Sequence, residues 1–295
     1  MASVGDRCAS AFLCSFAYSD CCDLGSFSPP EGCAYAWKWP EVASELCDVK
    51  RFSCPNTDAQ GVCAYRESDA TVFVAFRGTD SNRDALIDVS LVKKELVFMK
   101  DNAEGVKVHS GFRQQFLGSG EFVREYLATR PDRERVMVTG HSLGGALATL
   151  CSAMLKDEDG EEKVQCIVFG CPRTGNWKFA DEVDKLLSLE RVVVGADPVS
   201  DTPSRIRWKH AGLKTHYLDA RRVVCARRDP WFNALKLPNP LRLSDHSMSG
   251  YIDAVSKEEC QTGGGDAEEV PPWWSSESVL YTCMAALGAL TLVMK

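Results

Sequence analysis

The chain has 295 residues, of which 45% are hydrophobic and 25% charged, a composition typical of a soluble globular protein with one large domain or two small ones. Its formal net charge of −7 at pH 7 argues against a polyanionic partner, so nucleic-acid binding is not expected. None of its 14 cysteines forms a Cys-x-x-Cys pair, so we expect no metal site.

The first 60 residues are rich in cysteine, serine, proline and aromatic side chains. We expect an irregular N-terminal wrap of the main domain, in which Trp37 and Trp39 cover an apolar face. Eight cysteines precede residue 64. Residues 8–17 form a mild apolar run that makes a poor signal peptide, so we expect reduced and mostly buried cysteines. Disulfides around the wrap are the alternative.

Strand and helix patterns alternate over residues 61–258. In chain order we expect strands at 61–66 and 71–76, a loop-to-helix segment at 81–91, a strand at 106–109, a helix at 113–128, a strand at 164–169, a helix at 179–189 and a strand at 191–194. The strands are apolar runs rather than alternating patterns. This indicates one α/β domain with a mostly parallel sheet covered by helices on both faces.

The centre of the chain is residues 136–150, where a β-branched run leads into Gly140-His141-Ser142-Leu143-Gly144 and then into an alanine-rich segment. This order is typical of a nucleophile elbow, which is a strand, a tight turn with a serine at its apex, and a helix. Two glycines leave room where the backbone folds closely on itself. The positive end of the helix dipole would lie beneath Ser142.

A serine hydroxyl becomes an effective nucleophile when an imidazole takes its proton and a carboxylate orients that imidazole. In this architecture the acid and then the histidine follow the serine in the sequence. Asp197 comes directly after the strand at 191–194 and is the preferred acid, with Asp201 as the alternative. Of the five histidines, His246 is the preferred base on order, although order does not exclude His216.

Five short segments in this order resemble the class 3 (fungal-type) lipases, which have the α/β-hydrolase fold. They are FRGT (76–79), VHSGF (108–112), GHSLGGALA (140–148), FGCPRTGN (169–176) and DPV (197–199). The resemblance implies that Ser142 is the nucleophile, Asp197 the orienting acid and His246 the base.

The same resemblance implies an oxyanion hole made by the backbone N–H groups of Leu143 and Thr79, with help from the Thr79 hydroxyl. His109 and His210 fall on family positions that are not catalytic, so we expect structural hydrogen bonds from both. Residues 81–91 match the place of the family's lid, although Ala85 lies where its tryptophan is usually found.

The expected function is therefore that of a serine carboxylic-ester hydrolase, a lipase that acts on acylglycerols through an acyl-enzyme and needs no cofactor. A phospholipase A-type enzyme, a short-chain esterase and a thioesterase could use the same residues. A catalytically silent lipid-binding or interaction module is the alternative from another class. The presence of Ser142, Asp197 and His246 together argues against it.

The last part of the chain divides into an acidic, glycine-rich linker at 259–278 and an apolar run at 279–294. As a helix, 16 residues would reach about 24 Å against a hydrocarbon core of about 30 Å. We expect membrane association through this run, and an intracellular rather than a secreted protein. A cleaved lipid-anchor signal and a helix packed on the domain are the alternatives.

One local stretch departs from the acidic character of the chain. Residues 205–228 hold eight Lys or Arg side chains, and Asp219 is the one acid among them. A solvated basic face is the preferred interpretation, and a surface that meets anionic lipid headgroups is the alternative. The sequence does not indicate an oligomeric state.

Overall fold

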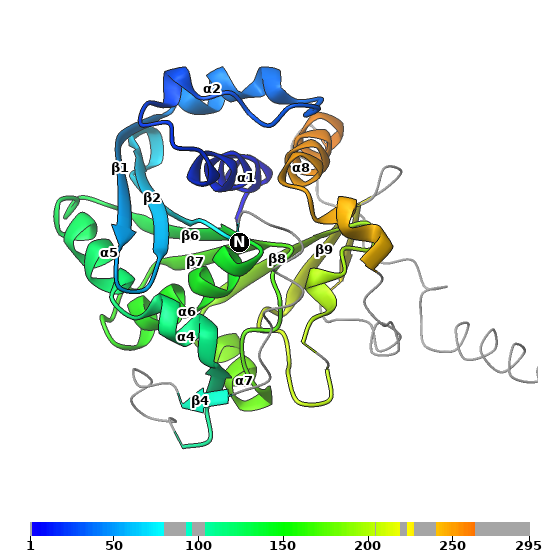
Figure 1. Cartoon of the computed structure of the whole chain (residues 1–295). Coiled ribbons are helices and arrows are strands. Elements are labelled where there is room, and N and C mark those ends of the chain that lie inside the picture. The colour runs from blue at the N-terminus through cyan, green and yellow to red at the C-terminus, as the bar shows by residue number, and fades with distance from the viewer. Residues whose placement is uncertain are drawn as a thin grey trace, which may run out of the picture.

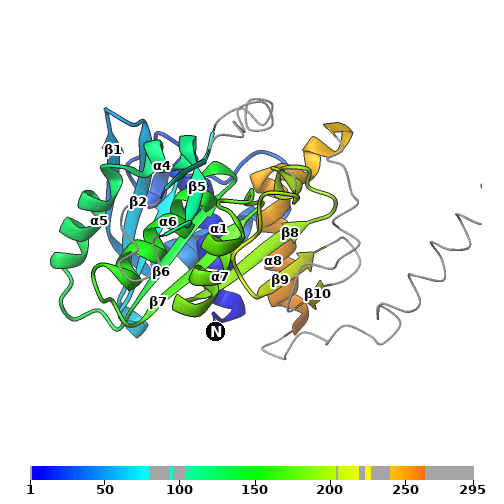
Figure 2. The same ribbon diagram turned by 90° about the horizontal axis from the view of Figure 1, so that it is seen from below.

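Apolar strands pair into one large sheet in the computed structural model, which describes residues 2–79, 93–95, 104–203, 205–218, 223–226 and 240–262. Within these residues the sheet has eight strands in the order β1-β2-β3-β6-β7-β8-β9-β10 (Figure 2). Neighbours from β3 to β9 run parallel, and the pairs at both ends of the sheet are antiparallel. The predicted mostly parallel α/β sheet is confirmed.

The strands are β1 Leu46–Cys54, β2 Ala59–Arg66, β3 Thr71–Phe76, β6 Arg135–His141, β7 Val164–Phe169, β8 Ser188–Val194, β9 Lys214–Leu218 and β10 Val223–Ala226. A separate antiparallel pair joins β4 Lys93–Glu95 to β5 Lys107–His109. The helices are α1 Val4–Tyr18, α2 Trp39–Ser44, α4 Ser110–Phe116, α5 Ser119–Ala128, α6 Leu143–Asp157, α7 Trp177–Leu186 and α8 Met248–Thr262.

Helices cover both faces of the sheet (Figure 1). Strand β3 shows why the strands are apolar throughout, because successive side chains point to opposite faces. Val72, Val74 and Phe76 join the core beneath α4, α5, α6 and α7, whereas Phe73 and Ala75 join the core beneath α1 and α8. Each strand therefore lies between two apolar cores.

The predicted strands lie where expected, although β2 and β8 begin two and three residues before the predicted starts at 61 and 191, and two predicted helices differ from the structure. Residues 113–128 form two helices, α4 and α5, because Gly118 adopts a positive φ of 96° between them. The helix predicted at 179–189 begins earlier, at Trp177, and ends at Leu186, so that its last predicted residues belong to β8. The predicted segment at 81–91 lies outside the described residues.

The first 60 residues are more regular than the sequence indicates. They contain the 15-residue helix α1 and the strand β1. Asp6 and Ser3 form a capping box that begins α1, and every residue from Asp6 to Ala17 is buried. A helix buried on all sides has no polar stripe, so its sequence lacks the helical period that would have predicted it.

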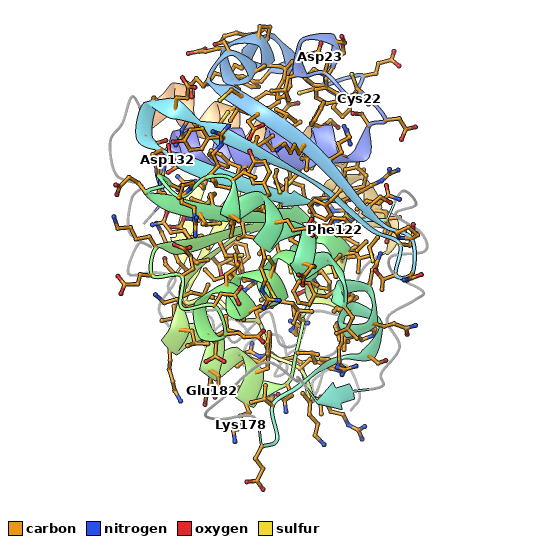
Figure 3. The ribbon with its side chains drawn as sticks, turned by 90° about the vertical axis from the view of Figure 1, so that its left-hand side faces the viewer. Cys22, Asp23, Phe122, Asp132, Lys178 and Glu182 are labelled. Atoms are coloured by element: carbon orange, nitrogen blue, oxygen red, sulfur yellow. The ribbon has the colours of Figure 1, made fainter. Side chains whose placement is uncertain are left out.

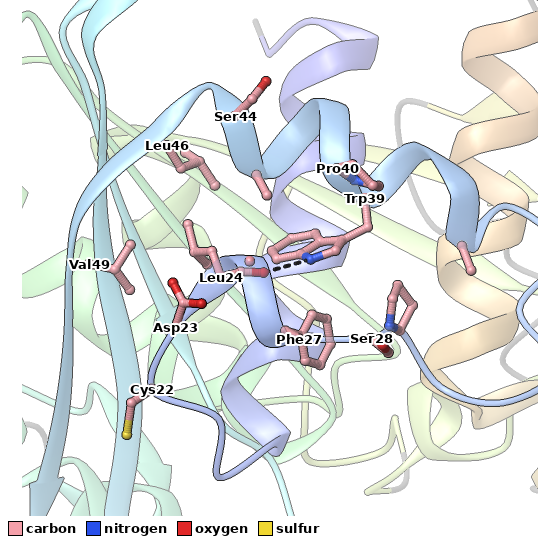
Figure 4. Close-up of a pocket in the computed structure, with 14 residues that line it drawn as sticks. Cys22, Asp23, Leu24, Phe27, Ser28, Trp39, Pro40, Ser44, Leu46 and Val49 are labelled. Carbon is pink, nitrogen blue, oxygen red and sulfur yellow. Dashed lines mark hydrogen bonds between the residues drawn. The ribbon is translucent and has the colours of Figure 1, made fainter.

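Trp39 covers an apolar face as predicted, whereas Trp37 is 64% exposed. The indole of Trp39 is buried against Phe12, Phe16 and Phe27, and its Nε1–H donates to the Leu24 carbonyl at 3.0 Å (Figure 4). A cavity of about 920 Å³ lies beside it, between α2 and the start of β1. The segment before β1 is thus a packed cover over α1.

Ion pairs attach the N-terminal end of α1 to the sheet. Asp6 accepts hydrogen bonds from Arg66 at 2.6 Å and from Arg135 at 2.8 and 2.9 Å. Burial alone would raise the pKa of Asp6, but these two guanidinium groups and the Ser3 N–H lower it to about 2. The next residue, Arg7, lies 3.5 Å from the buried Glu190 of β8.

Eleven cysteines of the described residues are free thiols, and seven of them are buried. No helix in the part of the chain that the structure describes is long and apolar enough to cross a membrane. The predicted membrane segment at 279–294 lies outside that part. Helix α8 continues to Thr262, beyond the predicted start of the linker at 259.

Candidate active site

The predicted nucleophile elbow forms between β6 and α6. Ser142 lies between His141, the last residue of β6, and Leu143, the first residue of α6. Its backbone has φ 58° and ψ −128°, a strained conformation that is uncommon outside glycine. The Ser142 N–H donates to the Phe169 carbonyl at 2.9 Å, which fixes the turn against β7.

The turn requires glycine on both sides of Ser142. A Cβ atom on Gly140 would lie 2.1 Å from the Gly144 carbonyl oxygen, and one on Gly144 would lie 2.3 Å from the Phe76 carbonyl oxygen. Both neighbours are backbone atoms, which cannot move aside as a side chain could. The close approach expected from the sequence is therefore present.

His246 and Asp197 meet beside this turn. His246 Nδ1 lies 2.7 Å from Asp197 Oδ2, and both side chains are buried. A bond to a carboxylate favours the proton on Nδ1, which leaves Nε2 as the basic nitrogen. His246 Nε2 is buried and has no hydrogen-bond partner among the described residues. The His141 ring lies 4.5 Å from the His246 ring, which brings His246 close to the elbow.

The alternative acid and base lie elsewhere. Asp201 Oδ1 lies 3.9 Å from Arg173 Nη2. His216 lies in β9, where its Nε2 is 3.0 Å from the buried Glu190 Oε2. The structure thus pairs His246 with Asp197.

The two predicted oxyanion residues border the elbow. Leu143 begins α6, where backbone N–H groups have no partner within the helix. Thr79 follows Gly78, and a Cβ atom on Gly78 would lie 2.6 Å from the His141 carbonyl oxygen. The backbone that leads to Thr79 therefore runs against the end of β6.

Tyr251 was not predicted from the sequence, and it holds Asp197 from the other side. Its hydroxyl donates to Asp197 Oδ2 at 2.5 Å, and the Val199 N–H donates to Oδ1 at 2.8 Å. Burial, and then the negative charge of Asp197, raise the pKa of Tyr251 well above its usual value. The phenol thus stays protonated and remains a donor.

Tyr18 and His141 complete the surroundings of His246. The Tyr18 hydroxyl lies 2.9 Å from His141 Nδ1. Burial, and then the neighbouring His246, lower the pKa of His141 well below its usual value, so this ring is neutral at pH 7. Tyr18 comes from the end of α1, and no sequence pattern relates it to residues more than 100 positions later.

His109 and His210 make the structural contacts that were expected of them. His109 Nδ1 accepts from the Gly111 N–H at 3.2 Å and so caps α4. His210 Nε2 lies 2.7 Å from the Ser200 carbonyl oxygen, in the segment that follows Asp197. No group of His, Cys, Asp and Glu in the described ranges could hold a metal ion.

Comparison with known proteins relates the central part of the chain to one family. Residues 73–206 match the family model of class 3 lipases. A lipase of Rhizomucor miehei is 31% identical over 183 residues, which are 58% of this chain and 48% of that protein. A secreted mono- and diacylglycerol lipase of Gibberella zeae is 32% identical over 213 residues, which are 61% of this chain and 50% of that protein.

The similarity extends to solved structures. Lipase II of Rhizopus niveus superposes with a TM-score of 0.58 at 26% sequence identity, over 72% of this chain and 80% of that one. The chain spans about half the length of the curated relatives that it matches. With its mostly parallel sheet and its elbow serine, the chain has the α/β-hydrolase fold, and its residues 73–206 are similar to the class 3 lipases.

Proposed function

We propose that the protein is a serine carboxylic-ester hydrolase that cleaves acylglycerols, with Ser142 as nucleophile, His246 as base and Asp197 as orienting acid. The observation that supports this proposal best is the state of His246. Its Nδ1 is held by a buried carboxylate, and its Nε2 has no partner among the described residues, beside a serine on a strained turn.

The proposed reaction has two steps. Ser142 Oγ attacks the ester carbonyl carbon while its proton passes to His246 Nε2, and the resulting oxyanion accepts hydrogen bonds from the Leu143 and Thr79 N–H groups. The intermediate collapses when His246 gives the proton to the departing glycerol oxygen, which leaves an acyl group on Ser142. Water then attacks this acyl-enzyme with His246 again as base, and the fatty acid leaves.

Asp197 would stabilise the imidazolium that forms in each step. Its charge is buried close to the ring, where water screens it little. Three hydrogen bonds to its two oxygens hold the carboxylate in one orientation. The ring would thus keep Nε2 directed away from Asp197 throughout the reaction.

We infer the substrate class from the proteins to which this chain is similar. Those described above are named as lipases, one of them as a mono- and diacylglycerol lipase. We propose acylglycerols as the substrate of this chain as well. Phospholipids, short soluble esters and thioesters would use the same chemistry, so a series of substrates is needed to separate these activities.

A fluorophosphonate probe and an ester series of increasing acyl length test the proposal. Ser142→Ala should abolish both labelling and turnover. Asp197→Asn should lower kcat by about 10⁴-fold, as the loss of the orienting carboxylate does in serine hydrolases. Asp201→Asn is the matched control and should retain activity.

Three results would count against parts of the proposal. Activity that survives Asp197→Asn but not Asp201→Asn would make the choice of acid wrong. Turnover confined to short soluble esters would exclude a lipase but not a hydrolase. Absence of both labelling and turnover in the wild-type protein would leave the lipid-binding or interaction module.

We also propose that the enzyme acts on lipid at a membrane surface and that residues 279–294 attach it there. This attachment is supported by the apolar sequence of the segment, which follows the linker that we propose for residues 259–278. Removal of residues 271–295 should shift the protein from the membrane fraction to the soluble fraction. Unchanged fractionation would contradict the proposal.

A further inference from the structure

A second cavity lies on the side of the molecule opposite the N-terminal cover. It measures about 620 Å³ and lies between α7 and the segment at 205–213. Figure 3 shows Lys178 and Glu182 of α7 at the opposite end of the molecule from Cys22 and Asp23. Lys209 pairs with Asp181, and the Gly212 N–H donates to Asp184 Oδ1 at 2.6 Å, so that the segment is fixed against α7.

The lining of this cavity is basic, although the whole chain has a net charge of −7. Its five cationic side chains are Arg173, Lys185, Arg191, Arg205 and Lys209, against Asp181 and Asp184. Lys209 pairs with Asp181 and Lys185 with Glu182, whereas the Asp184 carboxylate accepts from the Gly212 N–H. Arg205 Nη1 is buried and has no hydrogen-bond partner in the described parts of the chain. The lining therefore has an excess of cationic side chains, which favours an anionic ligand.

Apolar side chains surround the same cavity. Trp177 and Leu213 line it and are 46% and 51% exposed, and Ile206, next to Arg205, is 87% exposed. These are half of the large hydrophobic side chains that are exposed on the described part of the molecule. Lys209 Nζ lies 5.6 Å from the centroid of the Trp177 ring. Exposed aromatic and aliphatic groups beside Lys and Arg are typical of a surface that meets lipid headgroups.

We propose that this surface, formed by α7 and residues 205–213, docks the enzyme on a bilayer that contains anionic phospholipid. Headgroup phosphates bind the guanidinium and ammonium groups of the cavity. Trp177, Ile206 and Leu213 enter the interfacial layer beside them. An anionic bilayer fits both features, because its headgroups complement the basic lining and its interfacial layer accommodates the apolar rim. A soluble anion would not need that rim.

The docking surface is connected to the segment that carries the acid. Arg173 lines the cavity and donates through Nη1 to the Asp201 and Pro203 carbonyl oxygens. His210 also lines it and contacts the Ser200 carbonyl oxygen. The carboxylate of Asp197 lies three residues before Ser200, so the enzyme would dock with this part of the active site near the bilayer.

Binding to vesicles tests the proposal without turnover. The Ser142→Ala protein is mixed with vesicles of phosphatidylcholine alone or with added phosphatidylserine, and the bound fraction is measured by sedimentation. Arg205→Gln and Lys185→Gln should each weaken binding to the phosphatidylserine vesicles by about fivefold, the effect of one charge near a membrane surface. Neither change should affect the binding to phosphatidylcholine alone.

Matched variants control for charge and for hydrophobicity. Lys163 has a 63% exposed side chain, against 67% for Lys185, and lies outside the cavity, so Lys163→Gln should bind as the parent does. Trp177→Ser should lower the binding that remains in high salt, where charges are screened. Trp37→Ser, at an exposed tryptophan of the N-terminal cover, should not.

Equal effects of Lys163→Gln and Lys185→Gln would overturn the proposal, because net charge alone would then explain the binding. Displacement of the protein from vesicles by inorganic phosphate at constant ionic strength would also overturn it, since the cavity would then be a site for a small anion. Because binding is measured with the inactive Ser142→Ala protein, the result does not depend on the proposed lipase activity.

Discussion

The Asp197 carboxylate shows how single residues fix the geometry of the site. His246, Tyr251 and the Val199 N–H all bind its two oxygens. Gly170 makes this arrangement possible, because a Cβ atom there would lie 2.6 Å from Asp197 Oδ2 and 2.9 Å from His246 Nδ1. The absence of a side chain at Gly170 therefore leaves the space in which Asp197 and His246 meet.

Gly170→Ala should lower the proposed hydrolase activity by more than the strain at its positive φ explains. Gly170 has a φ of 53°, and the added methyl group would push apart Asp197 and His246, with an expected loss of about 10²-fold in kcat for a displacement near 1 Å. Gly160→Ala is the matched control, since Gly160 has a φ of 71° but no atom within 4 Å of an added Cβ. Steady-state kinetics and thermal melting of both variants provide the measurement. Equal activity in both would show that the methyl group is accommodated.

Tyr251→Phe should lower kcat by about tenfold and leave KM unchanged, because the lost hydrogen bond to a charged group orients Asp197 and does not contact substrate. Tyr126→Phe is the control, since it removes a buried hydroxyl that donates to the Asp48 carbonyl at 2.7 Å, away from the site. If both variants lose activity in proportion to their loss of stability, Tyr251 has no orienting role.

At the scale of elements, α1 is the part that sequence patterns could least predict. Predictions for β3 and β7 agree with the structure because strands buried on both faces are continuous apolar runs bounded by polar turns. Helix α1 is also buried on both sides, so its sequence shows no polar stripe that would mark it as a helix. Its position depends on contacts with β6 and α8, far along the chain, which no local pattern contains.

Asp6→Asn should destabilise the protein at pH 7 and by less at pH 3. The native pKa of Asp6 is about 2, below its ordinary value of 3.8, so the charged form contributes stability above pH 4 that is lost as the pH falls towards 2. The shift corresponds to about 2 kcal/mol, and the unpaired arginines add to the loss at pH 7. Urea unfolding of both proteins at pH 7 and pH 3 measures the difference. A difference that does not shrink in acid would show that Asp6 acts by packing alone.

At the scale of the whole molecule, the carboxyl ends of the parallel strands bring distant residues to one edge. This rule allowed Ser142 after β6 and Asp197 after β8 to be predicted as neighbours. His246 followed from chain order, but order alone could not exclude His216, because only the structure shows that its side chain contacts Glu190. The contact of Tyr18 with His141 could not be predicted from the sequence. It depends on how α1 packs against β6 in the folded protein, and no local pattern encodes that packing.

Truncation of the C-terminal end should therefore leave the fold intact, whereas truncation of the N-terminal end should destabilise it. A chain that ends at Thr262 retains every residue of the site and of both described cores, so it should keep its melting temperature and its activity on a short soluble ester. A chain that begins at Asp23 loses Phe12, Leu13 and Phe16, whose burial contributes about 5–9 kcal/mol, comparable to the whole stability of a domain. It should show no cooperative melting transition, and the loss of Tyr18 would leave His141 Nδ1 unpaired. If this second chain melts cooperatively and hydrolyses the ester, α1 is a dispensable cover rather than part of the fold.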